Sequence, residues 1–326
     1  MRERAVHTDI LEMIGDTPLL RLFRITEGVQ AEIYAKLEFL NPIGSIKDRI
    51  ARHMLEKAEE EGRIQPGDTI VDNSSGNTAL ALAVLCALKG YKLKVVVRDN
   101  LSGEKIKLLK ALKVDMVFVD HTLPPDSPDS YNNITPRIAA ETHRGYYFDQ
   151  HNNRENNEAH YLTTGPEIWE QMEGRIDYFV AGMGTGGTVC GSGKYLKEQD
   201  PGIRVMAVDP AGSVFHSYFK TGKTEQPASY LMEGLGDEFL IGCVDFEVLD
   251  DILQVTDKEA FLTARKLADV EGIMAGGSSG AALRACLDLA RRIDRPARIV
   301  TVFPDSAYRY LSTIYNDDWL REKNIL

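Results

Sequence analysis

The sequence predicts an α/β fold of two doubly wound domains, each built on a mostly parallel β-sheet. Short apolar runs, typical of buried strands, alternate along most of the chain with longer segments of helical periodicity. Strands that alternate with helices imply parallel crossovers and a sheet covered by helices on both faces. At 326 residues the chain is long enough to form two such domains.

Strand and helix signals in the first half follow one another in the order that this fold requires. Gly62 and Gly90 end two of the predicted helices, and a Pro-, Asp- and Asn-rich stretch at residues 121–133 is expected to be a surface loop. The expected strands are residues 19–22, 32–37, 69–71, 94–97, 116–119 and 146–148. The expected helices are residues 10–15, 53–61, 79–89, 102–112 and 134–142.

The second half repeats the same rhythm after an asparagine-rich stretch at residues 149–157. That stretch is the best candidate for a domain junction, so we expect an N-terminal domain of residues 1–149 and a C-terminal domain of residues 150–326. Residues 212–235 are expected to be an irregular polar excursion. The expected strands are 177–181, 204–208, 252–255 and 298–303, and the expected helices are 165–172, 190–198, 258–270 and 281–292.

Composition excludes several classes of function. A net charge of -11 and a pI near 5.2 argue against nucleic acid or an anionic membrane as a partner. No apolar run reaches membrane-spanning length and no signal-peptide core is present, so we expect a cytoplasmic protein. The four cysteines lie far apart, without a CxxC pair or metal-ligand spacing, which indicates buried reduced thiols and no metal site.

Lys47 is the first candidate functional residue. Pro42 and Gly44 break the preceding strand, and Ser45 is a candidate N-cap for the helix that follows. Lys47 then falls in the first turn of that helix, where the helix dipole disfavours a cation. A less firmly protonated, nucleophilic amine would follow. Most lysines near helix starts are ordinary solvated residues, however, and this pattern alone does not separate the two interpretations.

A glycine-rich loop, Gly184-Thr185-Gly186-Gly187-Thr188, lies between a predicted strand and a predicted helix. Backbone N–H groups that no side chain blocks, together with the helix dipole, form an anion-binding nest, and two hydroxyls add donors. A plain turn does not require this much glycine, which favours phosphate binding. The loop is not a P-loop, and no acidic residue stands where a dinucleotide fold would place one.

Two further polar loops open apolar helices in the same way. The loop Ser74-Ser75-Gly76-Asn77-Thr78 could hold a carboxylate or a second phosphate, or it could simply cap its helix. In Gly276-Gly277-Ser278-Ser279-Gly280, Ser278 could be an N-cap or a donor aimed at a ligand atom. The sequence alone leaves both pairs of alternatives open.

A reactive lysine, a phosphate loop and a carboxylate loop in one α/β chain suggest pyridoxal phosphate acting on amino acids. These stretches resemble the signatures of the cysteine synthase and cystathionine β-synthase family, which has the fold-type II, tryptophan synthase β-like architecture. The resemblance extends from residue 14 to residue 306. It leans toward the cystathionine β-synthase branch at Asp126-Ser127-Pro128-Asp129-Ser130, Ala159-His160-Tyr161, Thr163-Thr164, Glu233-Gly234, Gly236 and Pro304-Asp305-Ser306.

The resemblance implies a role for each candidate residue. Lys47 would bind the cofactor as a Schiff base and move the substrate's α-proton. The loop from Gly184 to Thr188 would hold the cofactor phosphate, Asn77 would face the phenolic oxygen, and Ser278 would meet the pyridine nitrogen. A neutral serine there favours β-elimination over transamination. The positions that would hold the substrate carboxylate are Ser74, Ser75, Asn77, Thr78 and Gln150.

Several positions depart from the family pattern without removing a catalytic group. Ser74 replaces the usual Thr, Asp72-Asn73 replaces Glu-Pro, and Ala79 replaces Gly. Residues 97–100 and 113–115 also differ from the usual runs. The departures favour a dedicated substrate pair over a housekeeping cysteine synthase. We expect neither the haem-binding extension nor the C-terminal regulatory pair of animal cystathionine β-synthases.

The sequence therefore predicts a β-replacement enzyme that uses pyridoxal 5'-phosphate. Serine, O-acetylserine or O-phosphoserine would react through an aminoacrylate, and homocysteine or sulfide would add to give cystathionine or cysteine. The alternatives are a C–N forming enzyme that makes diaminopropionate precursors, a serine/threonine dehydratase, and a cofactor-loaded binding protein. Intact Lys47 and Ser278 argue against the last. The expected partners are small amino-acid substrates and a second copy of the chain in a homodimer, with no nucleic acid and no membrane.

Overall fold

The computed structural model describes residues 6–101, 103–124 and 127–326, and it divides the chain into two compact units. Unit 1 comprises the described part of Met1–Ile14 together with Lys47–Glu155, and unit 2 comprises Gly15–Ile46 and Asn156–Leu326. Ser102, where we expected a helix to begin, and Asp126, part of the Asp-Ser-Pro-Asp-Ser motif, lie outside the described residues.

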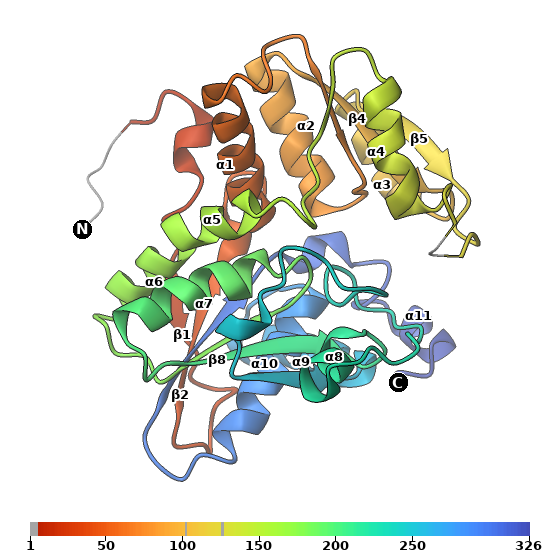
Figure 1. Ribbon diagram of the computed structural model, residues 1–326. Coiled ribbons are helices and arrows are strands. Elements are labelled where there is room, and N and C mark those ends of the chain that lie inside the picture. The colour runs from red at the N-terminus through yellow and green to blue at the C-terminus, as the bar shows by residue number, and fades with distance from the viewer. Residues whose placement is uncertain (1–5, 102, 125–126) are drawn as a thin grey trace. The chain divides into compact units, whose positions relative to one another are not determined.

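Unit 1 is built on a parallel sheet with the strand order β5-β4-β3-β6. Right-handed crossovers place the helices that follow β3 and β4 on one face and the helix that follows β5 on the other, and Figure 1 shows this alternation. The strands are β3 (Thr69–Asp72), β4 (Lys92–Arg98), β5 (Asp115–Val119) and β6 (Gly145–Tyr147). The helices are α1 (Lys47–Glu60), α2 (Asn77–Lys89), α3 (Gly103–Ala111) and α4 (Tyr131–Glu141).

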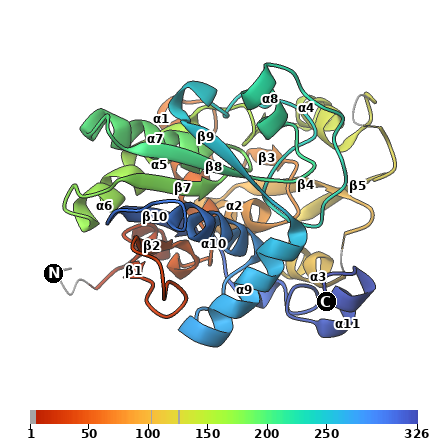
Figure 2. The same ribbon diagram turned by 90° about the horizontal axis from the view of Figure 1, so that it is seen from below.

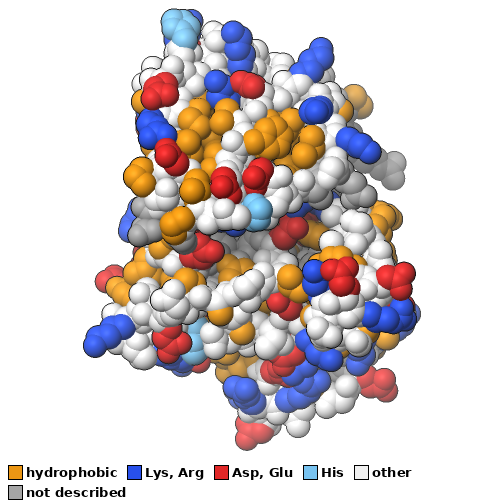
Figure 3. Space-filling model, turned by 90° about the vertical axis from the view of Figure 1, so that its right-hand side faces the viewer, with side chains coloured by type: hydrophobic (Ala, Val, Ile, Leu, Met, Phe, Trp, Pro, Cys, Tyr) orange, Lys and Arg blue, Asp and Glu red, His pale blue; other side chains and the backbone are white. Residues whose placement is uncertain are grey.

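Local chemistry explains where these elements begin and end. Every residue of β3 is buried, as expected for an inner strand with helices on both faces. Gly90 ends α2 in the left-handed conformation at φ 78° and donates its N–H to the Cys86 carbonyl. β5 is an edge strand, and its Phe118 is 48% exposed. Figure 3 shows apolar side chains gathered on one face of the molecule.

Unit 2 has a six-stranded sheet with the order β1-β2-β10-β7-β8-β9, parallel except for the β1–β2 pair. Figure 2 shows β10, β7, β8 and β9 side by side. The strands are β1 (Leu19–Arg21), β2 (Glu32–Leu37), β7 (Tyr178–Gly182), β8 (Arg204–Pro210), β9 (Asp251–Val255) and β10 (Arg298–Phe303). The helices are α5 (Glu155–Leu162), α6 (Thr164–Gln171), α7 (Gly187–Gln199), α8 (Phe215–Thr221), α9 (Asp257–Glu271), α10 (Gly277–Ala290) and α11 (Asp317–Glu322).

Successive residues of the inner strands of unit 2 enter two different apolar clusters. Ile299 and Phe303 of β10 belong to one cluster, whereas Val300 and Val302 belong to the other. Successive side chains of a strand point to opposite faces, so this sheet is covered on both sides. The mostly parallel, doubly wound α/β architecture predicted from the sequence is confirmed.

The two compact units differ from the division at residues 149 and 150. β2 pairs in parallel with β10, with Glu32 opposite Arg298 and Leu37 opposite Phe303. This pairing assigns residues 15–46 to unit 2, although the sequence suggested the N-terminal domain. The chain therefore passes between the units after Ile14, Ile46 and Glu155. Strand pairing between segments so distant in the chain leaves no local signal.

Other differences concern short or polar elements. α4 begins at Tyr131, inside the segment expected to be a loop, and α5 begins inside the asparagine-rich stretch expected to be a junction. α8 and α11 are also absent from the sequence prediction, and both are no longer than two turns. All four cysteines are buried and free, as predicted. Within the described residues no helix is long and apolar enough to cross a membrane.

A buried cation ties β2 to the start of unit 2. Lys36 on β2 is fully buried, and its ammonium lies 2.6 Å from a carboxylate oxygen of Glu167 on α6. The same ammonium donates to the Thr17 carbonyl at 2.6 Å and to Gln171 at 2.9 Å. Three donors thus meet three acceptors, which is the condition under which a buried ammonium is tolerated.

Replacing Lys36 by Met should destabilise the protein by about 3–5 kcal/mol, because Glu167 would keep its charge in a largely buried site without the ammonium. Glu167→Gln in the same chain should restore part of the loss. The exposed pair of Arg21 and Glu32 is the control, and Arg21→Met should cost less than about 1 kcal/mol. Urea unfolding measures all four chains; equal losses for Lys36→Met and Arg21→Met would contradict the prediction.

Candidate active site

Three loops of unit 2 lie at one edge of its sheet. β2, β10 and β7 are mutually parallel neighbours, so their carboxyl ends point to the same edge. The segments that leave these ends are residues 38–46, 304–306 and 183–187. Ligands of open α/β sheets bind at such an edge. The sequence motifs around Ser45, Thr185 and Asp305 therefore share one neighbourhood.

The glycine loop after β7 is packed so closely that side chains are excluded. A Cβ at Gly184 would stand 2.2 Å from the Gly234 carbonyl oxygen, and one at Gly187 would stand 1.8 Å from Oδ1 of Asn156. Gly186 has φ 85° as the N-cap of α7, a conformation that other residues rarely adopt. The first turn of α7 holds no acidic residue, whereas the first turns of α9 and α11 do. This helix start is suited to an anion.

Both threonines of the glycine loop contact side chains of α5. The Asn156 amide donates to Oγ1 of Thr185 at 2.9 Å, and Nε2 of His160 lies 3.2 Å from Oγ1 of Thr188. Nδ1 of His160 lies 2.9 Å from Oγ1 of Thr164. Sequence reasoning did not assign these partners, because it placed no helix over α5.

Ser278 lies in the first turn of α10, next to the segment that follows β10. Gly276 donates its N–H to the Asp305 carbonyl at 3.1 Å, and Ala275 and Ser306 form a bridge. Ser45 forms a second bridge with Asp305. Ser278 is largely buried, and no acidic residue occupies the first turn of α10.

The predicted carboxylate loop of unit 1 lies where β3 ends, beside the end of β6. Oγ1 of Thr78 donates to Oε1 of Gln150 at 2.7 Å, and Nε2 of Gln150 donates to Oδ2 of Asp72 at 3.2 Å. Oγ of Ser74 accepts from the N–H groups of Gly76 and Ala79 at 3.4 and 3.3 Å. Residues far apart in sequence are thus joined at one helix start, with Asp72 buried behind them.

Lys47 is the first residue of α1, directly after Ile46, whose N–H donates to the Pro304 carbonyl. Its charge acts on two buried groups of unit 1. Burial raises the pKa of Asp72 to about 7, and Lys47 opposes that rise. Burial and then the charge of Lys47 lower the pKa of His151 to about 4, so this imidazole is neutral at pH 7. Lys47 therefore lies within electrostatic reach of the carboxylate loop.

The predicted residues form two groups, one in each unit. Asp72, Asn156 and His160 contact these groups but were not among the predicted site residues; the only sequence signal for the last two is their spacing of four. The group in unit 1 is Lys47, Ser74, Ser75, Asn77, Thr78 and Gln150, and the group in unit 2 is Gly184, Thr185, Gly186, Gly187, Thr188 and Ser278.

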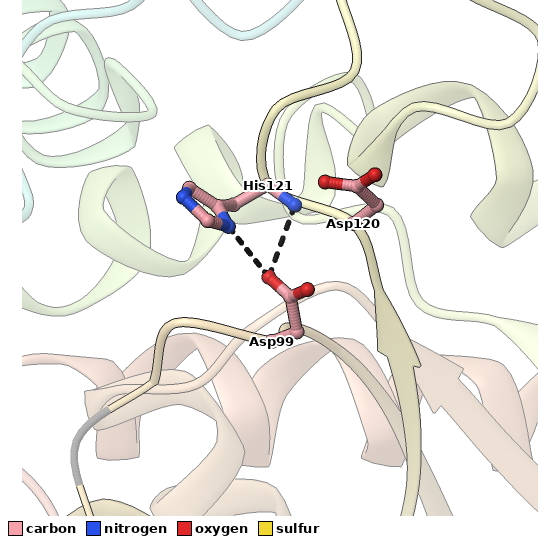
Figure 4. Close-up of side chains that lie close together, drawn as sticks. All are labelled: Asp99, Asp120 and His121. Atoms are coloured by element: carbon pink, nitrogen blue, oxygen red, sulfur yellow. Dashed lines mark hydrogen bonds and ion pairs between the residues drawn. The ribbon is translucent and has the colours of Figure 1, made fainter.

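A separate cluster of Asp99, Asp120 and His121 lies at the carboxyl ends of β4 and β5 (Figure 4). All three residues are exposed. Asp99 accepts from Nδ1 and from the backbone N–H of His121, and Asp120 accepts from Thr122, which lowers the pKa of both carboxyls. These hydrogen bonds account for the cluster without a metal ion.

Comparison with known proteins adds to this geometry. The family described as "Pyridoxal-phosphate dependent enzyme" matches residues 10–305. The chain is 41% identical over 320 residues to cystathionine beta-synthase of Apis mellifera, covering 98% of this chain but only 63% of that protein. It is 42% identical over 313 residues to cysteine synthase of Staphylococcus aureus, covering 95% of this chain and 97% of that one.

Two solved structures are similar over nearly the whole chain. O-ureido-L-serine synthase superimposes with a TM-score of 0.88 at 34% identity, covering 97% of this chain and 100% of that chain. A hydrogen sulfide-producing enzyme from Fusobacterium nucleatum superimposes with a TM-score of 0.84 at 34% identity, covering 93% and 97%.

The buried carboxyls predict an unusual dependence of stability on pH. Burial raises the pKa of Asp72 and of Asp209, at the end of β8, to about 7 from 3.8. Between these values the folded protein binds more protons than the unfolded chain, so the free energy of unfolding falls as pH rises from about 4 to about 7. Asp72→Asn or Asp209→Asn should each flatten that fall by up to about 4 kcal/mol.

Urea unfolding of the ligand-free protein at a series of pH values measures this slope. Asp294→Asn is the control, because Asp294 is exposed and its replacement should leave the slope as it is. A slope that neither Asp72→Asn nor Asp209→Asn changes would contradict the prediction.

Proposed function

The chain belongs to the family of pyridoxal-phosphate dependent enzymes, and on that premise we propose that it catalyses β-replacement on serine or on an O-activated serine. The nucleophile is a thiol, homocysteine or sulfide, and the product is cystathionine or cysteine. The observation that carries the proposal is the pairing of a neutral phosphate loop at the start of α7 with a neutral hydroxyl, Ser278, at the start of α10.

The residues present fit pyridoxal phosphate. A cradle of three glycines and two threonine hydroxyls at a helix start offers hydrogen-bond donors to a phosphate without any acidic neighbour in that turn. The donor set has the chemistry of an anion site, and the close packing behind Gly184 and Gly187 keeps the backbone in place. Lys47 supplies the amine that the cofactor's aldehyde requires.

In this proposal each residue has a definite task. The residues from Gly184 to Thr188 hold the cofactor phosphate, Asn77 donates to the phenolic oxygen, and the Ser278 hydroxyl lies against the pyridine nitrogen. The bound cofactor supplies an electron sink for the substrate's α-carbon. Lys47 binds the cofactor and carries the α-proton between steps. The substrate carboxylate accepts hydrogen bonds from the carboxylate loop, whose members are Ser74, Ser75, Asn77, Thr78 and Gln150.

Uncharged partners give this site its proposed selectivity among reactions. A carboxylate beside the pyridine nitrogen would keep a proton there and deepen the electron sink, whereas a serine hydroxyl does not. Negative charge then leaves the α-carbon by expelling the β-substituent, which is the step that β-replacement requires. The buried Asp72 accepts from the Gln150 amide and so holds the end of the carboxylate loop.

The relatives support the thiol nucleophile, since both cystathionine beta-synthase and cysteine synthase are more than 40% identical to this chain. The chain spans less than two thirds of the listed animal protein, so its substrates remain part of the proposal. A nucleophile other than sulfur is the second candidate, supported by the similarity to O-ureido-L-serine synthase. The homodimer and the cytoplasmic location stay predictions.

The decisive experiment incubates the purified protein with serine, O-acetylserine or O-phosphoserine, alone and with homocysteine, sulfide or a panel of amines. We expect cystathionine or cysteine, identified by mass, only when donor and thiol are both present. Lys47→Ala should abolish turnover and the covalent attachment of the cofactor. Ammonia and pyruvate without a nucleophile would show a dehydratase instead, and normal turnover in Lys47→Ala would refute the assignment of the lysine.

The fit of the phosphate loop predicts a specific loss in Gly187→Ala. The added methyl group would clash with Asn156, so the loop must shift and the affinity for pyridoxal phosphate should fall more than tenfold. Gly103→Ala, at the start of α3, is the matched control, because no atom lies within 4 Å of its Cβ. Titration of the cofactor-free proteins gives the affinities, and thermal melting gives the stability. If Gly187→Ala lowers the melting temperature but not the affinity, the loop is a plain turn.

A further inference from the structure

We propose that helix α5 fixes the direction of the two threonine hydroxyls in the glycine loop, so that both donate their protons to the ligand's phosphate. Asn156 and His160 on α5 are the positioning residues. This inference rests on the proposed function, in which Thr185 and Thr188 hold the cofactor phosphate. It assigns α5 a task that neither the family description nor the names of the relatives contain.

The two positioning residues lie four apart on α5, on one face of the helix. Both are fully buried, and each reaches one threonine of the loop. An amide nitrogen can only donate, so Oγ1 of Thr185 accepts from Asn156 and its own single proton must point elsewhere. The hydroxyl of Thr185 is thereby left to donate on the side away from α5.

His160 can produce the same result at Thr188 in one tautomer only. If Nε2 carries the proton, it donates to Oγ1 of Thr188, and the Thr164 hydroxyl donates to the bare Nδ1. If Nδ1 carries the proton, Thr188 must donate to Nε2, and its oxygen lone pairs then face the phosphate. Lone pairs against an anion are repulsive, whereas a hydroxyl that donates to an anion makes a strong, charge-assisted bond.

The phosphate therefore favours the neutral Nε2–H tautomer of His160. In that state the bonds run in one direction, from Thr164 to His160, from His160 to Thr188, and from Thr188 to the phosphate. Thr185 repeats the last two steps with Asn156 in place of the imidazole. Loss of one correctly directed hydroxyl, bonded to a charged group, should weaken binding by about tenfold or more.

Two substitutions at the same position separate the tautomer from the shape of the side chain. The amide nitrogen of glutamine can stand in for Nε2 and donate to Thr188, so His160→Gln should keep the affinity for pyridoxal phosphate within about threefold. Asparagine reaches only as far as Nδ1, so His160→Asn should lose about tenfold. His143→Gln is the control, because His143 is exposed and lies in unit 1.

The affinities of the cofactor-free proteins for pyridoxal phosphate and for pyridoxal, which lacks the phosphate, are measured in parallel. In His160→Asn only the first affinity should fall. If the wild type binds both equally well, the proposed phosphate loop fails. If the wild type discriminates and His160→Asn discriminates just as strongly, the role of α5 fails while the phosphate loop stands.

Nitrogen-15 NMR of histidine-labelled holoenzyme reads the tautomer directly. The signal of His160, assigned as the one missing from His160→Gln, should show a protonated Nε2 and a bare Nδ1 at pH 7. A protonated Nδ1, alone or together with a protonated Nε2, would overturn the inference.

Discussion

The parallel pairing of β2 with β10 is the constraint on which the rest of this structure depends. It draws residues 15–46 into the sheet of unit 2 and sets the carboxyl end of β2 beside those of β10 and β7. The segment that leaves β2 then bridges to Asp305 through Ser45 and to Pro304 through Ile46. Lys47 follows immediately, so the candidate catalytic amine starts from a fixed point although its helix belongs to the other unit.

The candidate site depends on neutral donors more than on charge. Within the described residues, the starts of α2, α7 and α10 hold no acidic side chain, and their polar groups are hydroxyls, amides and backbone N–H groups. Neutral donors must be aimed, because a hydroxyl that points the wrong way presents lone pairs instead of a proton. Buried partners such as Gln150 and Asn156 supply that aim. The fold thus spends buried polar side chains on direction as well as on stability.

The sequence predicted the features whose causes are local. The alternation of strands and helices predicted the fold class, and the three polar loops do open helices, at Asn77, Gly187 and Gly277. The strand bounds 32–37 and 298–303 are also those of the structure, because apolar runs set them. Local patterns of this kind need no knowledge of the partner.

Features with distant causes could not be read in this way. Nothing within residues 32–37 says that their neighbour is residues 298–303 rather than a strand of the first half. α5 begins with Glu-Asn-Asn-Glu, a composition typical of a loop, and its buried face is explained only by contacts with the glycine loop. Asp72 was noted merely as a departure from the family pattern, and its partner Gln150 comes from another strand end.

The passage of the chain between its two units also bears on the order in which they form during synthesis. Apart from its N-terminal segment, unit 1 is one continuous stretch that ends at Glu155, so the ribosome releases all its strands early. β2 is made before any of them, yet it cannot pair with β10 until residue 303 has emerged. Two apolar-faced strands thus wait without their partner through most of translation, and pairing at such sequence separation is intrinsically slow. The nascent chain must keep this waiting edge from aggregation, a demand that the finished fold no longer reveals.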